Sequence, residues 1–471
     1  MSDEYSDKRF ATRAVWSGGP NIEGAASTPV FLTSTYQLTD ERYQGWADGA
    51  QHTELYSRLS SINSEAVAAK VVALEGAEDG ETFASGMSAV STALLALLSK
   101  DDHMVASADC YGGTYGLITE DLPRFGIEVS MADMRDPSSY EAAIQENTKV
   151  LYVETLTNPV LKVCDLEAMA AIAKKHGLIA IVDNTFATPW ACNPIPMGFD
   201  LVIHSGTKYL GGHSDLIAGI VVGRKDLVAE IFAKKVHLGG AADPHMCYLL
   251  ERGMNTLHAR MPIHAANSAE LARRLEAHPM IESVNHSSLP SYVDYEVAQR
   301  IMPRGTGMLS YVVKGGDDAA LRFMRALELV FEATSLGGTQ SLVECPFNSS
   351  HMFVPEDVRR EAGVVPGFVR MSVGKRGRRG HLGGYGSGSG RSQRLPREPG
   401  LRVRHGDRPP SGYPRLHHPD VLHTRPQQRA VCCARLPARS EGDHAPDSGN
   451  GDRLGDARSV RRRCHGIHRG E

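Results

Sequence analysis

The chain of 471 residues lacks several features that would assign it quickly to a class of protein. Its net charge is only −4, so no bulk positive charge argues for binding to nucleic acid. Its longest apolar stretch, around Ala93–Leu98, is far too short to cross a bilayer. The polar start MSDEYSDKRF shows no sign of a signal peptide. We therefore expect a cytoplasmic protein that binds neither nucleic acid nor a membrane.

Cysteine pairs are also absent from the first 374 residues. Five scattered cysteines occur there, none in a CxxC pair: Cys110, Cys164, Cys192, Cys247 and Cys345. This spacing suggests neither a zinc ribbon nor a disulfide framework, and free thiols in the core are the favoured interpretation. His204 and His213 have no acidic or thiol residues at metal-ligand spacing, so we expect no metal site.

Lysine nearly disappears after residue 374. Residues 1–374 contain 12 Lys and 18 Arg, whereas residues 375–471 contain 1 Lys and 20 Arg together with many Gly, Pro and His. We predict four regions: an N-terminal arm (1–60), an α/β domain (61–250), a smaller α+β domain (251–374) and a disordered tail (375–471).

Short apolar runs alternate with helical patterns in the second region. We predict buried strands at 103–109, 149–154, 178–183, 200–205 and 218–223, and helices at 139–147 and 166–177, the latter ending at Gly177. This alternation indicates an α/β fold with a mostly parallel sheet. In the third region we predict helices at 268–279 and 319–329 and a strand at 307–316.

Polar residues follow the predicted strands. In parallel sheets, ligands bind beyond the carboxyl ends of the strands. The residues at or just after those ends are Tyr111, Glu154, Asn158, Asp183, Ser205, Thr207 and Lys208. We expect them to converge on one crevice.

Lys208 and Asp183 suggest a particular chemistry. An amine that forms a Schiff base must spend time unprotonated, and partial burial or a cationic neighbour lowers its pKa. A buried carboxylate needs a partner, such as the protonated ring nitrogen of pyridoxal phosphate. The simpler alternatives are a solvent-facing lysine at a helix start and an aspartate that caps a turn.

A phosphate group would find donors nearby. Ser85, Gly86 and Met87 stand at the start of a helix predicted to run to about Lys100, where backbone N–H groups are unpaired. The hydroxyl groups of Ser205 and Thr207 would add to this set, although simple helix capping is the alternative.

Eight motifs then show a resemblance to a known family: YSR (56–58), FASGM (83–87), YGGTY (111–115), ETLTNP (154–159), VDNTF (182–186), HSGTKYLGGHSD (204–215), SLGGTQSL (335–342) and VRMSVG (369–374). They resemble the trans-sulfuration enzymes, the pyridoxal-phosphate (PLP) enzymes of cysteine and methionine metabolism, over about residues 10–374. The resemblance implies the aspartate-aminotransferase fold (fold type I), with a large, mostly parallel sheet domain and a smaller C-terminal α+β domain. It also implies a homotetramer built as a dimer of dimers.

The resemblance also implies roles for individual residues. Lys208 would bind the cofactor covalently and carry protons between substrate carbons, while Asp183 would face the pyridine nitrogen. Asn158 would face the ring hydroxyl, and Tyr111 would stack on the ring and protonate the leaving group.

The remaining implied roles concern the phosphate and the substrate. Gly86, Met87, Ser205 and Thr207 would hold the phosphate, and Tyr56 and Arg58 would reach the phosphate of a neighbouring subunit. Arg370 would pair with the substrate α-carboxylate, a two-pronged contact that lysine cannot copy, and Thr334 and Ser335 would also contact the substrate.

The sequence departs from the family pattern at three places. Ser61-Ile62-Asn63 replace a usual Asn-Pro-Thr, Gly113 stands where methionine γ-lyases typically have Cys, and Thr334 stands where many cystathionine-using members have Glu. The uncharged Thr334 disfavours a bulky zwitterionic substrate. We predict γ-elimination on a small γ-substituted L-amino acid, giving a 2-oxoacid and ammonia. The alternatives are a γ-replacing synthase or sulfhydrylase and, third, a non-enzymatic binding protein.

The C-terminal tail departs most from the family pattern. After residue 374 the family normally continues into an acidic amphipathic helix, whereas KRGRRGHLGGYG (375–386) follows here. One legal coding of Arg376–Gly386, read one base later, encodes Glu-Asp-Val-Glu-Asp-Ile-Leu-Ala-Asp-Met. We predict a frameshift near Lys375, in the gene or its record. The alternative is a genuine basic, disordered tail that binds RNA or acidic partners.

Overall fold

The structure is a computed structural model that describes residues 5, 7–19, 22–48, 55–349 and 356–375. All of them belong to one compact unit, Met1–Leu395. The predicted tail, apart from Lys375, lies outside the described residues, so the predictions about its disorder and its reading frame stay predictions.

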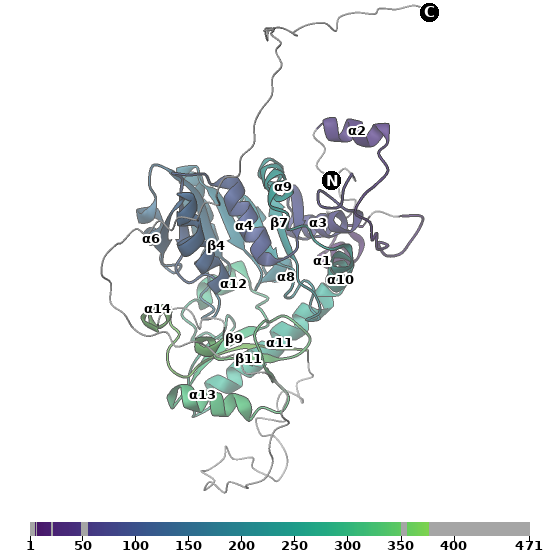
Figure 1. Cartoon of the computed structure of the whole chain (residues 1–471). Helices are drawn as coiled ribbons and strands as arrows, with labels where there is room; N and C mark the ends of the chain where they lie inside the picture. The colour runs from purple at the N-terminus through teal and green to yellow at the C-terminus, as the bar shows by residue number, and fades with distance from the viewer. Residues whose placement is uncertain (1–4, 6, 20–21, 49–54, 350–355, 376–471) are drawn as a thin grey trace, which may run out of the picture. The chain divides into compact units, whose positions relative to one another are not determined.

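A seven-stranded sheet forms the larger half of this unit (Figure 1). Its order is β1-β7-β6-β5-β4-β2-β3, in which β3, β2, β4, β5 and β6 run parallel and β7 is antiparallel to both neighbours. The strands are β1 Asp79–Phe83, β2 His103–Ser107, β3 Glu128–Ala132, β4 Thr148–Glu154, β5 Ile179–Asp183, β6 Leu201–Ser205 and β7 Gly219–Gly223.

All five strands that the sequence predicts in this region are present, which confirms the mostly parallel α/β layer. Two further strands were not predicted, because their sequences lack an apolar run. In β1 the buried Glu81 forms an ion pair with Lys235, and β3 is a partly exposed edge strand.

Helices cover both faces of this sheet. On one face α4 (Gly86–Leu97) and α9 (Lys225–Leu238) contact each other and β7, while α3 (Ile62–Glu75) packs against β1 and β7 on the other. Side chains of β6 alternate accordingly: Leu201 and Ile203 join one apolar core and Val202 joins the other. The buried strands therefore read as continuous apolar runs.

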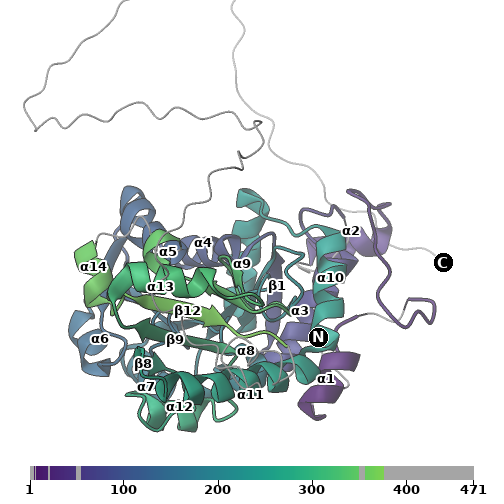
Figure 2. The same cartoon turned by 90° about the horizontal axis from the view of Figure 1, so that it is seen from below.

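A second sheet of five strands lies below the first in Figure 1 and is seen from its own side in Figure 2. Its order is β10-β11-β12-β9-β8. The strands are β8 Ile281–Asn285, β9 Met308–Val313, β10 Phe331–Glu332, β11 Leu342–Glu344 and β12 Phe368–Ser372. Helices α11 (Leu257–Glu276) and α13 (Gly316–Arg325) pack against it, which confirms the smaller α+β layer.

Helix boundaries were predicted less well. The helix predicted at 139–147 is α6, Pro137–Ala143, because Ile144 is extended and the Gln145 N–H donates a hydrogen bond to Thr148 Oγ1 instead of continuing the helix. The helix predicted at 319–329 ends at Arg325, and the one predicted to reach about Lys100 ends at Leu97.

Two further helices were predicted, of which one fits its predicted bounds and one does not. Helix α7 (Leu166–His176) ends at a left-handed Gly177, as predicted. Helix α11 starts 11 residues before the predicted 268–279, because Pro262 lies inside it and hides its first turns. The others are α1 Phe10–Trp16, α2 Asp40–Ala47, α5 Gly112–Gly116, α8 Thr188–Ala191, α10 Pro244–Asn255, α12 Tyr295–Ile301 and α14 Glu356–Glu361.

Two further observations concern the described residues as a whole. None of their helices combines the length and apolarity needed to span a bilayer. The five cysteines of the first 374 residues are buried and unpaired, which confirms the prediction of free core thiols.

Candidate active site

The polar residues at the strand ends converge on one cavity of about 460 Å³. It lies at the carboxyl ends of the parallel strands, where an α/β sheet binds its ligands. The predicted site residues that line it are Gly86, Met87, Tyr111, Asn158, Asp183, Ser205, Thr207, Lys208, Thr334, Ser335 and Arg370. The predicted crevice is thus present, and only Tyr56 and Arg58 are outside it.

Lys208 follows β6 and reaches into this cavity, partly buried. Its Nζ donates a hydrogen bond to Ser335 Oγ at 2.9 Å, and no carboxylate of the described chain forms a salt bridge with it. Burial and then the charge of Arg370 lower the pKa of Lys208 to about 8, against the opposing effect of Glu344. About a tenth of the amine is therefore neutral at pH 7 and about half at pH 8, so it is available as a nucleophile or base far more often than a solvent-facing lysine is.

The loop that holds Ser335 is fitted closely to the lysine turn. Ser335 has a left-handed backbone (φ 75°), which is strained for a residue other than glycine. At Gly337 a Cβ atom would lie 2.6 Å from Tyr209 N, so this loop approaches the turn as closely as it does only because that residue is glycine.

Two carboxyl groups end neighbouring strands in register. Glu154 of β4 pairs with Asp183 of β5, and both side chains line the cavity. Burial raises the pKa of Asp183, against a hydrogen bond from Thr185 N at 2.9 Å. That bond is the turn-capping contact considered above as the simpler alternative. Burial and the adjacent Asp183 raise the pKa of Glu154 well above its usual range.

Tyr111 follows β2 at the edge of the cavity. Its backbone N–H donates to Glu154 Oε1 at 2.6 Å, and its side chain is 43% exposed. A Cβ atom at Gly113 would lie 2.7 Å from Tyr111 Cε1 and 3.0 Å from Met87 Sδ. The glycine that departs from the methionine γ-lyase pattern therefore permits this position of the tyrosine ring.

The start of α4 and the end of β6 form a cradle of donors. Ser85 caps α4, with its Oγ accepting from Ser88 N at 3.0 Å. At Gly86 a Cβ atom would lie 3.0 Å from Ser205 Cβ, so glycine permits this close approach. The first-turn N–H groups of a helix are an anion site, and Thr207 lines the same cavity.

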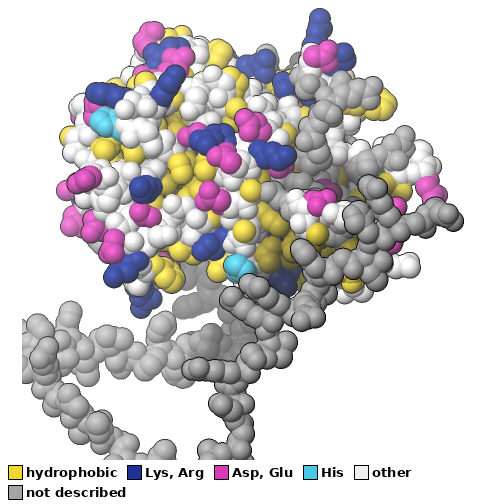
Figure 3. Space-filling model, turned by 90° about the horizontal axis from the view of Figure 1, so that it is seen from above, with side chains coloured by type: hydrophobic (Ala, Val, Ile, Leu, Met, Phe, Trp, Pro, Cys, Tyr) yellow, Lys and Arg dark blue, Asp and Glu magenta, His cyan; other side chains and the backbone are white. Residues whose placement is uncertain are grey.

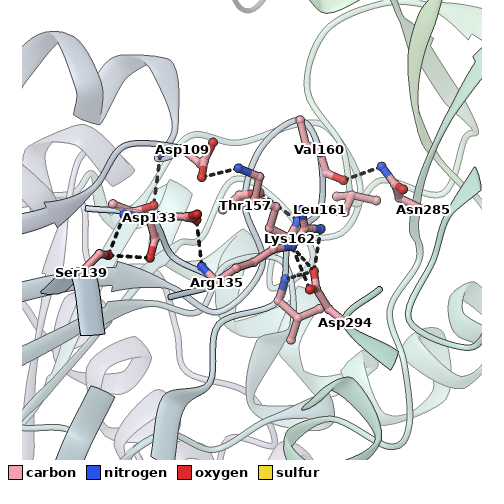
Figure 4. Close-up of polar contacts among 12 residues, drawn as sticks. Asp109, Asp133, Arg135, Ser139, Thr157, Val160, Leu161, Lys162, Asn285 and Asp294 are labelled. Carbon is pink, nitrogen blue, oxygen red and sulfur yellow. Dashed lines mark hydrogen bonds and ion pairs between the residues drawn. The ribbon is translucent and has the colours of Figure 1, made fainter. Parts of the chain in front are cut away.

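Asn158 lies in the loop 157–163, which is tied to both sheets (Figure 4). Within the larger half, Lys162 Nζ pairs with Asp109 at 2.7 Å, and that aspartate leads into the Tyr111 turn. From the smaller half, Asp294 accepts a hydrogen bond at 3.1 Å from the backbone N–H of the last loop residue. Ion pairs and backbone contacts from both layers therefore fix the position of the asparagine.

Arg370 enters the cavity from β12 of the smaller sheet. Its Nη2 pairs with Glu344 Oε1 at 2.6 Å, and its Nη1 donates to Asn158 Oδ1 at 2.6 Å. Nη2 also donates to the backbone oxygen of Ser335 at 3.0 Å, whereas Nε is buried and has no hydrogen-bond partner in the described structure. Burial lowers the pKa of Arg370, and Glu344 opposes this effect.

Tyr56 and Arg58 lie elsewhere in this chain. Tyr56 is 44% exposed, and the Arg58 guanidinium lies 5.4 Å from the centre of the Tyr56 ring and donates to Val236 O. A second cavity, of about 900 Å³, adjoins the first and shares Thr207, Ile217, Thr334 and Ser335 with it.

The part of the chain that the structure describes contains no group of three His, Cys, Asp or Glu side chains that could hold a metal ion. His213 Nδ1 contacts Gly211 O at 2.8 Å, and His204 Nε2 contacts the buried Glu75 at 2.7 Å.

Sequence reasoning missed two residues of this site. Glu154 was noted at a strand end but received no role, although it holds the Tyr111 backbone. Glu344 was not considered, although a Glu within the apolar run LVECPF needs a buried partner. That signal could have directed attention to the pair with Arg370.

The residues present fit PLP. The donor cradle suits a phosphate, and the Lys208 amine, whose pKa is lowered to about 8, suits reaction with an aldehyde. The Asp183 and Glu154 carboxyl groups have no salt-bridge partner within the described residues, and a protonated ring nitrogen would supply the missing positive charge. The buried, unpartnered Nε of Arg370 is a donor that a substrate carboxylate could use.

Comparisons with known proteins agree with this geometry. The family model described as Cys/Met metabolism PLP-dependent enzyme matches residues 11–376. The chain is 40% identical over 375 residues to L-methionine gamma-lyase of Porphyromonas gingivalis, covering 78% of this chain and 93% of that protein. It is 39% identical over 358 residues to cystathionine gamma-lyase of Bacillus subtilis, covering 76% and 92% respectively.

A solved structure gives the same result. The crystal structure of cystathionine gamma-lyase from Lactobacillus plantarum complexed with L-serine matches with a TM-score of 0.75 and 34% identity, over 80% of this chain and 97% of that chain. The match confirms the predicted fold type I. The chain belongs to the family of PLP-dependent enzymes of cysteine and methionine metabolism.

Proposed function

We propose that this protein catalyses γ-elimination on a small L-amino acid with a leaving group at Cγ, giving a 2-oxoacid and ammonia, and that the cavity residues named above carry the reaction. The observation that carries the proposal is the convergence of Lys208, Asp183, Tyr111 and Arg370 on one cavity. A γ-replacing synthase is the alternative.

Each side of the cavity would hold a different part of the cofactor. The start of α4 at Gly86 and Met87, with the hydroxyl groups of Ser205 and Thr207, would bind the phosphate. Asp183 would hold the ring nitrogen protonated, and Asn158 would donate its side-chain N–H to the ring hydroxyl. Bound in this way, PLP supplies an electron sink for the carbon next to the substrate amine.

The protein's own groups would then move the protons. Arg370 would bind the α-carboxylate and fix the orientation of the substrate, with Ser335 and Thr334 beside it. The Lys208 amine would take the proton from Cα and, after passing it on, one from Cβ, because a γ-group can leave only once Cβ has lost a proton; with a pKa of about 8, about half of the free amine is neutral at pH 8. The Tyr111 phenol would donate a proton to the departing γ-group, and the exposed half of its side chain leaves room for that group.

A longer substrate is the second candidate. The adjoining cavity is lined by the carboxylates Asp215 and Glu332, together with the neutral Thr334. These acids would favour a longer thioether substrate with a cationic group at its far end. Thr334, which carries no charge, would not favour such a group.

We also propose that two copies of the chain complete each site. Helix α2 has no buried residue and stands away from the larger sheet in Figure 1, and the arm around it exposes Leu32, Tyr43 and Trp46. Hydrophobic side chains also reach the surface between charges of both signs on the face shown in Figure 3. Tyr56 and Arg58, which lie outside their own cavity, would reach the phosphate of the neighbouring subunit, as the resemblance implies, within a dimer of dimers.

Complementation would test the shared site. Arg58→Ala and Lys208→Ala each should be inactive, but mixed dimers contain one site with both residues intact. Mixing under subunit exchange should restore activity, to about a quarter of the parent value. Two inactive variants that stay inactive after verified exchange would contradict the shared site.

Two properties of the whole chain remain proposals. The five buried, unpaired cysteines support a reducing compartment, and we place the protein in the cytoplasm.

The family match ends at residue 376, next to the proposed frameshift at Lys375, which supports an altered reading frame from there on. The nucleotide sequence would decide between the two readings. If no single-base shift near Lys375 restores an acidic helix, the frameshift proposal is wrong.

A substrate panel would test the function. The purified protein with PLP is incubated with amino acids that carry sulfur, oxygen or halide at Cγ, with and without sulfide or cysteine. Equal amounts of ammonia and 2-oxoacid are expected without an added nucleophile. A product formed only with sulfide or cysteine would instead establish γ-replacement.

A further inference from the structure

Arg370 already holds a carboxylate of its own chain. Glu344 and Arg370 are directly opposed in the pairing of β11 with β12, and Glu344 Oε1 lies 2.6 Å from Arg370 Nη2. Their side chains are only 3% and 4% exposed. Two opposite charges therefore meet inside the protein at the wall of the candidate active site.

The other acceptors leave few donors for a ligand. Asn158 Oδ1 accepts from Nη1 and Ser335 O from Nη2, so only Nε lacks a partner within the described residues. A substrate carboxylate that binds Arg370 would come to lie beside Glu344. Like charges repel strongly where water is excluded, so this approach costs binding free energy.

We propose that Glu344 is a specificity-determining residue that weakens carboxylate binding at Arg370. It neutralises the buried guanidinium while the cavity holds no ligand, and it competes with the α-carboxylate of the substrate and with that of the 2-oxoacid product. Weaker carboxylate binding would favour product release. The inference rests on the proposed function, because it takes Arg370 as the carboxylate site.

The charge dependence of Arg370 supports this role. The pKa of Arg370 is lowered by burial and raised by Glu344, so the two charges influence each other.

Glu344→Gln is the test variant, because glutamine keeps the shape and the Oε1 acceptor and removes only the charge. Glu282→Gln makes the same change at an exposed position on β8, at the far edge of the same sheet, and serves as the matched control.

Two ligands isolate the carboxylate. Glycine and glycinamide differ in the carboxyl charge, and neither carries a γ-leaving group. Each is titrated at one pH into the PLP-loaded protein, and binding is followed through the visible spectrum. The preference of the parent for glycine over glycinamide should rise at least about tenfold in Glu344→Gln and stay within about twofold in Glu282→Gln.

The outcomes separate the two levels of the argument. An unchanged or smaller preference in Glu344→Gln, with a clear preference in the parent, would overturn the role of Glu344 alone. A parent without any preference would contradict the proposed role of Arg370, and this inference with it. A purely structural Glu344 would weaken both ligands together and lower Tm, leaving the ratio unchanged. If Glu344→Gln does not fold, Glu344→Met is measured in the same way, with the same expected direction.

Discussion

The two sheets form opposite walls of the cavity, and the charged groups of the two walls differ in whether they have a salt-bridge partner. On the larger sheet Lys208, Asp183 and Glu154 have no oppositely charged salt-bridge partner within the described residues. Burial lowers the pKa of Lys208 and raises the pKa of both carboxyl groups, which in each case favours the neutral form. On the smaller sheet Arg370 forms a close ion pair with Glu344. Unpaired groups with shifted pKa values suit proton transfer, whereas Glu344 opposes the lowering of the Arg370 pKa by burial and so helps the guanidinium to keep its charge.

Removing the lysine should have the largest effect. Lys208→Ala should abolish the visible absorption of the lysine-bound cofactor and stop turnover, because no other amine replaces it at the end of β6. Absorption spectra and activity assays at equal protein concentration would check this. A variant that keeps both its colour and normal rates would remove Lys208 from the mechanism.

Removing the aspartate should have the next largest effect. Asp183→Ala would leave the ring nitrogen without its counter-charge, so loss of the substrate α-proton should slow by about 10² or more. Exchange of that proton with deuterated solvent measures the step directly. Unchanged exchange would mean that Asp183 only caps the turn at Thr185, a contact that it makes in the structure.

Tyr111→Phe should separate stacking from acid catalysis. The ring is kept and the acid is lost, so elimination of a poor leaving group should fall by about 10²–10⁴-fold. A halide needs little protonation and should be far less affected, with cofactor affinity nearly intact. Equal slowing of both substrates, or release of the cofactor, would make Tyr111 a packing residue and would leave Tyr56 of a neighbouring subunit as the next candidate.

The smallest expected effect concerns pH. The pKa of Lys208 is lowered to about 8, so its neutral fraction rises as pH rises through that value and then levels off. PLP should therefore attach to the cofactor-free protein about tenfold more slowly at pH 7 than above pH 9. Glu344 opposes the lowering, so Glu344→Gln should shift the midpoint to lower pH. A rate that keeps rising toward pH 10.5 would show an ordinary lysine.

The wall formed by the larger sheet could be predicted from the sequence. Its parallel strands are contiguous apolar runs, and the polar residue that ends each run lies at a common edge whatever the details of packing. The pattern of apolar runs is therefore sufficient to bring Asp183 and Lys208 together. Strands β1 and β3 were not predicted, because they are strands through their pairing with β7 and β2 and not through an apolar composition.

The opposite wall could not be predicted in the same way. The pairing of Glu344 with Arg370 depends on the register between β11 and β12, which are separated by more than 20 residues and whose pairing no local pattern specifies. The position of Asn158 depends likewise on contacts such as Asp294, which come from the other half of the molecule. Long-range contacts of this kind require the tertiary structure.

Chemical trapping tests the central claim most directly. The PLP-loaded protein is reduced with borohydride, digested and mapped by mass spectrometry, which records the lysine that carried the cofactor. The account predicts a reduced pyridoxyl phosphate group on Lys208, the residue with the lowered pKa at the end of β6, and none on the exposed lysines of α7 or α9. A label on any other lysine, or on none, would contradict it.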